Sequence, residues 1–312
     1  MRSVKVFAPA SVANVGCGYD VLGFAVHHPG DEVIMSINQS GRVTLDHIEG
    51  DGGRLPYDPE KNTVSAVVIS YLQHIGDKKG IGIKLYKKMP FGSGLGSSSA
   101  SAVAGLVAIN ELMGRPLSRL ELLPFAMEGE RLACGNAHAD NVAPAILGGM
   151  VLIRSYDPLD VISLPVPEGL SCALVYPHVE IPTMAARQII RTNIPMTSAI
   201  RQWGNVGGLV AGLYKNDLGL IGRSLEDVIV EPVRKMLIPH FDEIKELAME
   251  NHALGFGISG SGPTVFALCR DVKTAENITL AIKEKLWDHG LDSSVYVSEV
   301  NTQGAHVIDV DA

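Results

Sequence analysis

The spacing of apolar and polar positions alternates between a strand-like and a helix-like period along the chain. Residues Ile81–Lys87 alternate apolar and polar side chains, which is typical of a strand. Asn62–Ile75 and Leu117–Leu132 instead carry apolar residues at helical spacing, and Asn62 is a candidate helix cap. A run of small and apolar residues, Ala100–Ile109, predicts another helix. Because short strands and helices alternate throughout, we expect an α+β fold.

The segments before residue 60 carry mostly strand patterns. Val4–Phe7 predicts a strand that breaks at Ala8–Ser11. Glu32–Asn38 and Arg42–Asp46 predict a pair of strands, and the glycine-punctuated segment Asn14–Gly23 predicts a turn carrying polar side chains.

The second half of the chain shows the same mixture. Expected strands are Met150–Ile153, Cys172–Tyr176, Val265–Leu268 and Ser294–Val300, and expected helices are Thr183–Arg191, Ser198–Asn216, Leu218–Val228, Phe241–Asn251 and Val272–His289. The segment Tyr156–Gly169 contains three prolines, which favours a boundary near its start. We therefore expect two domains, residues 1–155 and 156–312.

Composition limits the class of protein and its partners. A chain of 312 residues with 46% hydrophobic and 19% charged residues is typical of globular proteins. The net charge of −8 argues against nucleic acid as the main partner. The N-terminus has no signal-peptide core and the most apolar run is too short to span a membrane, so we expect a cytoplasmic protein with no membrane partner. The four cysteines, Cys17, Cys134, Cys172 and Cys269, form no C-x-x-C pair and are expected to be buried thiols.

The segment Pro90–Ala100 combines three alternating glycines with three consecutive serines, directly before a predicted helix. Glycines allow a ligand to approach the backbone closely, and serines are good helix caps. Free N–H groups and the positive end of the helix dipole make such a start an anion site. The order of strand, glycine-rich loop and helix therefore predicts a phosphate site.

Two familiar glycine-rich motifs do not match this segment. A Walker loop requires a lysine after the last glycine, and none follows Gly96. The pattern G-x-G-x-x-G requires glycine at position 97, which is Ser97. A flexible loop before a core helix is the remaining structural alternative.

Several charged or polar side chains are candidates for the chemistry around a phosphate. A carboxylate and a hydroxyl, such as Glu130 with Ser97 or Ser98, commonly hold Mg²⁺ together with substrate phosphates. Arg187 and Arg234 could each bind a carboxylate through two hydrogen bonds. Each of these residues has an ordinary alternative role on a solvated helix face or in a surface ion pair.

Assembled, these motifs resemble the GHMP small-molecule kinases. Their ATP loop, Pro-x-x-x-Gly-Leu-Gly-Ser-Ser-x-Ala, matches residues 90–100 throughout. Three further segments, Ala8–Gly23, His138–Pro144 and Ile258–Thr264, resemble the branch of that family that phosphorylates homoserine. The resemblance implies a ribosomal protein S5 domain 2-like N-terminal domain and a ferredoxin-like C-terminal domain.

The resemblance also implies a role for each candidate residue. The ATP phosphates would lie on Pro90, Phe91, Gly92, Ser93, Gly94, Leu95, Gly96, Ser97, Ser98, Ser99 and Ala100, with Lys87 beside them and Asn62 toward the adenine. Ser98 and Glu130 would hold Mg²⁺. The L-homoserine pocket would be lined by Asn14, Asp20, His138, Asp140, Asn141, Thr183, Arg187, Arg234 and Gly260.

Within that pocket, the resemblance implies that Arg187 and Arg234 face the substrate carboxylate and that Asp20 faces its ammonium. Asp140 and Asn141 would orient the hydroxyl that receives the phosphoryl group, and this transfer requires mainly positioning and charge neutralisation. Two alternatives stay open: a relative acting on mevalonate or a sugar, and a catalytically silent nucleotide-binding module. Members of the family are often dimers, although no surface pattern in this sequence argues for a homodimer.

Overall fold

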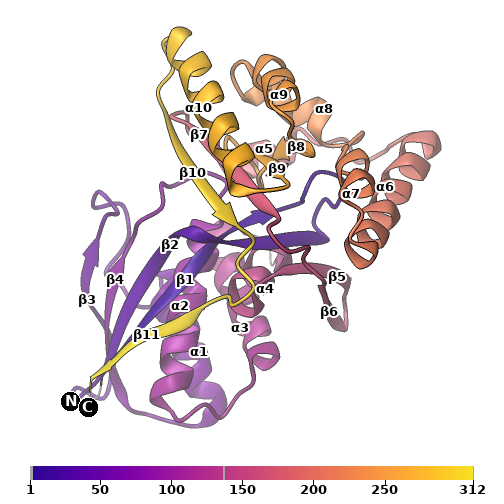
Figure 1. Cartoon of the computed structure of the whole chain (residues 1–312). Coiled ribbons are helices and arrows are strands. Elements are labelled where there is room, and N and C mark those ends of the chain that lie inside the picture. Colours follow the sequence, from indigo (N-terminus) through magenta and orange to yellow (C-terminus); the bar gives the residue numbers. More distant parts are fainter. Residues whose placement is uncertain (1–2, 136–137, 312) are drawn as a thin grey trace.

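A computed structural model describes residues 3–135 and 138–311 (Figure 1). Its strands are β1 (Ser3–Ala13), β2 (Leu22–Asn38), β3 (Val43–Glu49), β4 (Gly80–Tyr86), β5 (Met150–Tyr156), β6 (Leu159–Leu164), β7 (Ser171–Pro177), β8 (Gly255–Ile258), β9 (Val265–Cys269), β10 (Ser293–Glu299) and β11 (His306–Asp311). Its helices are α1 (Thr63–Ile75), α2 (Ser97–Leu112), α3 (Arg119–Cys134), α4 (Ala139–Leu147), α5 (Thr183–Gln188), α6 (Met196–Lys215), α7 (Leu218–Ser224), α8 (Glu231–Arg234), the 3₁₀ turn η1 (Lys235–Leu237), α9 (Phe241–Glu250) and α10 (Val272–Asp288).

The described strands form two sheets, which confirms the α+β prediction. The first has seven strands: β11-β1-β2-β4-β3 are neighbours in that order, and the hairpin β5–β6 joins through β2. The expected direct pairing of Glu32–Asn38 with Arg42–Asp46 is wrong, because β4 lies between β2 and β3 and pairs with both. The short connection after β2 thus leaves room for a strand that comes later in the chain.

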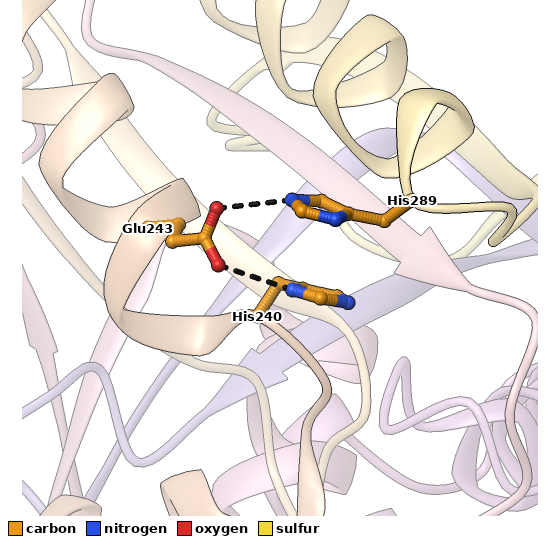
Figure 2. A group of neighbouring side chains, drawn as sticks. All are labelled: His240, Glu243 and His289. Atoms are coloured by element: carbon orange, nitrogen blue, oxygen red, sulfur yellow. Dashed lines mark hydrogen bonds and ion pairs between the residues drawn. The ribbon is translucent and has the colours of Figure 1, made fainter.

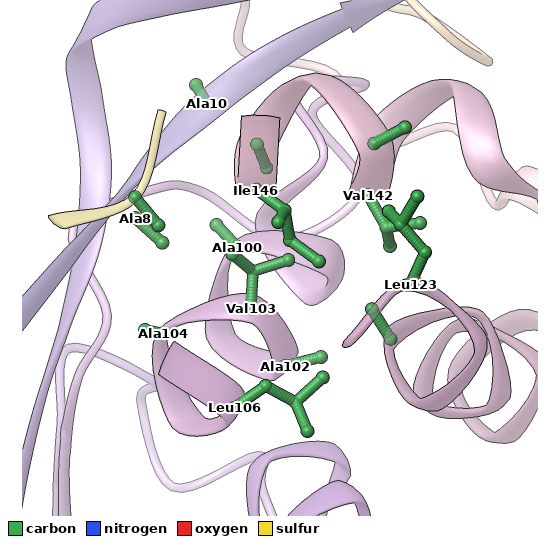
Figure 3. Close-up of a cluster of buried hydrophobic side chains, with 14 of the residues drawn as sticks. Ala8, Ala10, Ala100, Ala102, Val103, Ala104, Leu106, Leu123, Val142 and Ile146 are labelled. Atoms are coloured by element: carbon green, nitrogen blue, oxygen red, sulfur yellow. The ribbon is translucent and has the colours of Figure 1, made fainter. Parts of the chain in front are cut away.

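Strand β1 also corrects the sequence analysis, because it continues through the expected break at Ala8–Ser11. Proline lacks an N–H donor, and Pro9 lies where the register between β1 and β2 shifts, a position at which a sheet tolerates proline. Ala8 and Ala10 point toward the helical layer and are fully buried near Ala100 (Figure 3). Their small side chains let helix α2 approach the sheet closely.

Helix α2 is buried on nearly every side. It packs on β1 and β2 and is covered by α1, α3 and α4. Figure 3 shows its residues Ala100, Val103 and Leu106 between the sheet and the neighbouring helices. Close helix packing extends to Gly129 on α3, where an added Cβ would lie 2.6 Å from Val67 Cγ1. This close approach places the next residue, Glu130, against the start of α2.

The second sheet, β10-β7-β9-β8, is antiparallel throughout the described strands. Successive side chains along its strands point to opposite faces of the sheet, and each face packs in a different hydrophobic core. Leu174 and Phe266 join the core of the first sheet, whereas Val175 and Val265 pack with helices α9 and α10 on the other face. Helices α6 and α7 stand beside these layers (Figure 1).

The sheets cross the expected boundary between residues 155 and 156 in two places. That position lies inside the β5–β6 hairpin, and both strands of the hairpin belong to the first sheet. Strand β11 returns from the C-terminus to pair with β1. The described chain therefore passes from the first sheet to the second between β6 and β7, and the last strand closes the first sheet.

None of the helices within residues 3–135 and 138–311 combines the length and the apolar character that crossing a bilayer requires.

Candidate active site

The glycine-rich loop ends in an unusual helix start. Helix α2 begins at Ser97, and its N-cap is Gly96 in the left-handed conformation, φ 67°. The expectation that a serine caps this helix is wrong, because the three serines form its first turn and no described side chain caps the N-terminus. The first N–H groups of the helix are thereby left to a ligand, as an anion site requires.

The loop is held by close contacts that only glycine allows. An added Cβ on Gly94 would lie 2.4 Å from the Ser259 carbonyl oxygen, and one on Gly96 would lie 2.3 Å from Ser11 Oγ. Ser259 Oγ donates a hydrogen bond to the Gly94 carbonyl at 2.7 Å, and Thr264 N donates to Ser93 O at 3.1 Å. The second glycine-rich segment thus supports the first from behind.

Lys87 leads from β4 into this loop, but its ammonium is already engaged. Nζ forms an ion pair with Asp31 and donates hydrogen bonds to Ser97 Oγ (2.6 Å), Ser97 O (2.8 Å) and Ser101 Oγ (2.8 Å). The Asp31 carboxylate also accepts from Lys88 N and Ser101 Oγ, both at 2.9 Å. Only 2% of the Lys87 side chain and none of Asp31 is exposed. The pair therefore fastens the first turn of α2.

A carboxylate and hydroxyls meet at the same helix start. Glu130 on α3 is buried, and it accepts a hydrogen bond from Ser99 Oγ rather than from Ser98. The Ser98 hydroxyl is buried and has no hydrogen-bond partner within the described structure. These oxygen donors are of the kind that Mg²⁺ prefers.

A cavity extends from the glycine-rich loop to Arg187 and Arg234. At this second end, charged side chains from distant segments converge on Tyr19. The Arg187 guanidinium lies 2.8 and 3.1 Å from the two Asp20 carboxylate oxygens. The Arg187 and Arg234 Cζ atoms lie 5.5 and 5.2 Å from the Tyr19 ring centre, within the range of a cation–π interaction. Burial, and then the charge of Asp20, raise the pKa of Tyr19. With two guanidinium groups and one carboxylate, this end carries a net positive charge.

Backbone oxygens and amides orient these groups. The Gly260 carbonyl accepts hydrogen bonds from Asn14 Nδ2 and Arg234 Nη1, both at 2.8 Å. Asn14 Oδ1 accepts from Asp20 N at 3.1 Å, and Thr183 Oγ1 lies 3.3 Å from Ser261 Oγ. The second glycine-rich segment therefore supports both ends of the cavity.

Helix α4 contributes the groups between the two ends. Asp140 is buried, and its Oδ1 has no partner among the described residues. Burial, followed by the charges of Asp20 and Glu130, raises the pKa of Asp140 to about 8. Asn141 Oδ1 accepts a hydrogen bond from Ser11 Oγ at 2.9 Å. His138 precedes them, and burial lowers its pKa.

One cavity of about 430 Å³ joins both ends, a volume typical of small-molecule sites. Its lining includes nearly all candidate residues: Asn14, Asp20, Asn62, Lys87, Phe91, Gly92, Ser93, Gly94, Gly96, Ser97, Ser98, Ser99, Glu130, His138, Asp140, Asn141, Thr183, Arg187, Arg234 and Gly260. Pro90, Leu95 and Ala100 are not part of the lining; Leu95 and Ala100 are fully buried in the core. Asn62 also caps α1, as expected, by accepting from Val64 N.

Sequence reasoning missed residues that hold the candidates in place. Asp31 carries no local signal, because its partners are distant in sequence. Tyr19 could have been found from the sequence, because it is an aromatic residue directly beside Asp20, a candidate substrate-binding residue. Tyr156 donates a hydrogen bond to Asp20 O at 2.7 Å and accepts from Ala139 N at 3.3 Å, which ties the turn before β2 to α4.

Comparison with known proteins identifies relatives over both halves of the chain. The family model "GHMP kinases N terminal domain" matches residues 62–149, and "GHMP kinases C terminal" matches residues 209–287. The homoserine kinase of Chlorobium phaeobacteroides is 51% identical over 99% of this chain and 100% of that protein.

Solved structures show the same relationship. The crystal structure of homoserine kinase from Cytophaga hutchinsonii is 57% identical, with a TM-score of 0.96 over 98% of this chain and 97% of that chain. L. major mevalonate kinase, in complex with R-mevalonate, has a TM-score of 0.72 at 16% identity, covering 95% of this chain and 96% of that chain. The latter likeness shows a shared fold alone.

Proposed function

Because this chain belongs to the GHMP kinase family, and within it to the homoserine kinases, we propose that it transfers the γ-phosphoryl group of ATP to the side-chain hydroxyl of L-homoserine. The observation that carries the proposal is a continuous cavity, which joins an anion-binding helix start to a pocket for a zwitterion. The product is O-phospho-L-homoserine, an intermediate of threonine biosynthesis. Pairing of a phosphate loop with an amino-acid pocket also argues against a silent nucleotide-binding module.

The phosphate end binds ATP through backbone groups. The uncapped N–H groups at the start of α2 face the cavity with the positive end of the helix dipole. Lys87 acts indirectly, because its ammonium holds Ser97 and Ser101 while Asp31 neutralises its charge. Lys87 therefore fixes the loop, and the backbone of the loop, not the lysine side chain, positions the phosphates. Asn62 lies at the cavity wall, where it is proposed to face the adenine.

The residues present fit a magnesium ion. Ser98 supplies a buried hydroxyl with no other described partner, and Glu130 supplies a carboxylate at the same helix start. Bound there with ATP, Mg²⁺ would neutralise charge on the transferring phosphoryl group. Ser99 holds the Glu130 carboxylate in place from the adjacent position.

The opposite end is suited to an amino acid. Arg187 and Arg234 offer guanidinium groups to the carboxylate, and Asp20 offers an anion to the ammonium. Asp20 and Arg187 form an ion pair with each other, with 25% and 31% of their side chains exposed. A zwitterion can replace this pair by giving each partner an opposite charge. An uncharged sugar offers a countercharge to neither Asp20 nor Arg187, and a hydroxy acid offers one to Arg187 alone.

Asp140 and Asn141 are proposed to orient the acceptor hydroxyl. The unpartnered Asp140 Oδ1 lies in the wall between the two ends, where the hydroxyl must meet the phosphoryl group. With a pKa of about 8, the Asp140 carboxyl is mostly protonated at neutral pH, and only its ionised fraction, which grows as pH rises, can accept a hydrogen bond from the hydroxyl and take up the proton that it loses.

The deciding experiment measures ADP release with Mg-ATP and each of four acceptors: L-homoserine, mevalonate, galactose and none. Turnover with L-homoserine alone, and a phosphate ester on its side-chain oxygen by ³¹P NMR, is the expected outcome. Turnover with another acceptor would reject the proposed pocket. Bound ATP without any turnover would favour the silent module.

Two truncated acceptors test each end of the pocket. 4-Hydroxybutyrate lacks the ammonium, and 3-aminopropanol lacks the carboxylate, but both retain the reacting hydroxyl. We expect kcat/KM to fall by at least about 30-fold for each, since a charge-assisted contact is lost. Equal turnover of 4-hydroxybutyrate and L-homoserine would remove Asp20 from the proposed pocket.

A further inference from the structure

A cluster of two histidines and a glutamate lies outside the cavity, on the helices that cover the second sheet. His240 and Glu243 stand at the first turn of α9, and His289 follows the end of α10. None of them lines the catalytic cavity. Figure 2 shows the Glu243 carboxylate at the edge of both imidazole rings, with one oxygen facing each ring.

The donor atoms of these residues converge. His240 Nδ1 lies 3.2 Å from Glu243 Oε1, and His289 Nε2 lies 3.0 Å from Oε2. One ligand atom from each residue lies within 4.8 Å of the others. In a tetrahedral zinc site with bonds of about 2.0–2.2 Å, neighbouring donors are separated by roughly 3.3 Å. The carboxylate–imidazole distances therefore already approach those of a metal site.

The type of donor points to a particular class of ion. Two imidazoles and one carboxylate suit Zn²⁺ and neighbouring divalent transition metals, whereas Mg²⁺ and Ca²⁺ prefer oxygen alone. We propose that His240, Glu243 and His289 form a binding site for a divalent transition metal of the zinc class, which fastens α9 to α10. Water completes the coordination, because all three side chains reach solvent.

Two local features must change when the ion binds. The imidazole rings are stacked, with centres 3.8 Å apart and planes 10° from parallel, so each must turn to direct its lone pair at a shared ion. Lys285 Nζ lies 3.1 Å from Glu243 Oε2 and must leave the carboxylate. Both changes involve partly exposed side chains, which can turn without moving the core.

The backbone conformation of His240 suggests a matched control. Its φ is 58°, a conformation that is uncommon for residues other than glycine and is adopted more often by asparagine, aspartate and histidine than by other side chains. His252, just beyond the other end of α9, has a similar φ of 68° but does not belong to the cluster. The substitutions His240→Asn and His252→Asn are therefore a matched pair, since asparagine accepts this backbone in both places.

The test is calorimetric titration of chelator-treated, tag-free protein with ZnCl₂. We expect one equivalent to bind, with affinity at least about tenfold weaker in His240→Asn and in His289→Gln but unchanged in His252→Asn. Lys285→Gln should bind zinc more tightly, because a competing cation is removed. Equal affinity in the wild type, His240→Asn and His289→Gln, or no binding by the wild type, would overturn the proposal.

Thermal unfolding supplies a second readout of the same site. At a free zinc concentration 100 times the dissociation constant, the ratio of folded to unfolded protein should rise about 100-fold. At the same zinc concentration the rise in Tm should be clearly smaller in His289→Gln and unchanged in His252→Asn, while kinase activity stays the same in both. A rise in Tm as large in His289→Gln as in the wild type would place the ion elsewhere and reject the proposed site.

Discussion

Two ion pairs lie at opposite ends of the candidate catalytic cavity, and their surroundings differ sharply. At the end proposed to bind phosphates, Lys87 and Asp31 are 2% and 0% exposed, and Lys87 donates a hydrogen bond to Ser97 in the first turn of α2. At the end proposed to bind the amino acid, Arg187 and Asp20 are 31% and 25% exposed, and the Arg187 guanidinium lies over the ring of Tyr19. The first pair is part of the framework, whereas the second remains accessible to a ligand.

The difference follows from what each end is proposed to bind. Phosphates can be held by backbone N–H groups, so the nearby charges can stay paired and buried while they fix the loop. A zwitterionic amino acid needs two side-chain charges of opposite sign. Those charges must be close enough to stabilise each other and accessible enough to exchange partners. Breaking the buried pair should therefore damage the fold, and breaking the accessible pair should damage binding.

The largest expected effect comes from Lys87→Met, which leaves Asp31 buried without its countercharge. We expect the free energy of unfolding to fall by about 3–5 kcal/mol, against less than about 1 kcal/mol for Arg187→Met. Urea denaturation measures both. The double variant Asp31→Asn/Lys87→Met should recover much of the loss, because no buried charge remains. Equal losses in Lys87→Met and Arg187→Met would remove the distinction between the pairs.

Glu130→Gln tests the metal at the phosphate end. Removing this charge should lower kcat by about 10²–10³-fold with little change in KM for L-homoserine, because the ion acts on the transferring phosphoryl group. Steady-state kinetics at saturating Mg-ATP would show it. Glu128→Gln on the same helix is the control, since Glu128 is exposed and pairs with Arg131. A kcat for Glu130→Gln close to that of Glu128→Gln would reject the assignment.

Arg234→Met tests the amino-acid end. The loss of a charge-assisted contact to the carboxylate should remove at least about 2 kcal/mol of transition-state stabilisation. We therefore expect kcat/KM for L-homoserine to fall roughly 30-fold while KM for ATP stays nearly constant. Arg201→Met, which removes an exposed ion pair with Glu226, should change neither. If Arg234→Met impaired ATP and L-homoserine equally, the two ends would not be separate sites.

A comparison of Gly94→Ala with Gly114→Ala separates two effects of an added methyl group: backbone strain and collision with a neighbouring atom. Gly94 has φ 80°, and Gly114 has φ 83° with nothing within 4 Å of an added Cβ. The left-handed backbone should cost each alanine variant about 1 kcal/mol of stability, and Gly94→Ala should lose more, because its added Cβ would lie 2.4 Å from Ser259 O. Only Gly94→Ala should also raise KM for ATP, by about tenfold, because its methyl group collides with Ser259 O. A similar KM for ATP in both variants would show that the contact does not position the loop.

Asp140→Asn should change stability by an amount that depends on pH. The folded-state pKa of about 8 exceeds the ordinary 3.8, so the folded protein binds more protons between these values and loses stability as pH rises through them. Asparagine cannot ionise. The variant should therefore gain Tm relative to wild type at pH 8, by at least about 2 °C, but not at pH 4. A Tm difference that does not change with pH would show that Asp140 is not held at a raised pKa.

Much of the fold was accessible from the sequence because many signals are local. The helical spacing and cap of Asn62–Ile75, the strand before the loop and the loop itself were all predicted close to their observed positions. The family and the α+β class are confirmed by the comparisons. Short or irregular strands were missed: β6 and β11 lie among turns, and β11 is stabilised by pairing with β1 at the opposite end of the chain.

The candidate site divides in the same way. The sequence by itself predicts a phosphate loop, because that motif lies in one contiguous segment, and the resemblance to the family adds a carboxylate for a metal and charges for an amino acid. Only the tertiary structure decided that Lys87 pairs with Asp31, that Ser99 rather than Ser98 contacts Glu130, and that two arginines lie near the ring of Tyr19. Burial and countercharges depend on segments far apart in the chain, and the energy of a charge depends on what surrounds it.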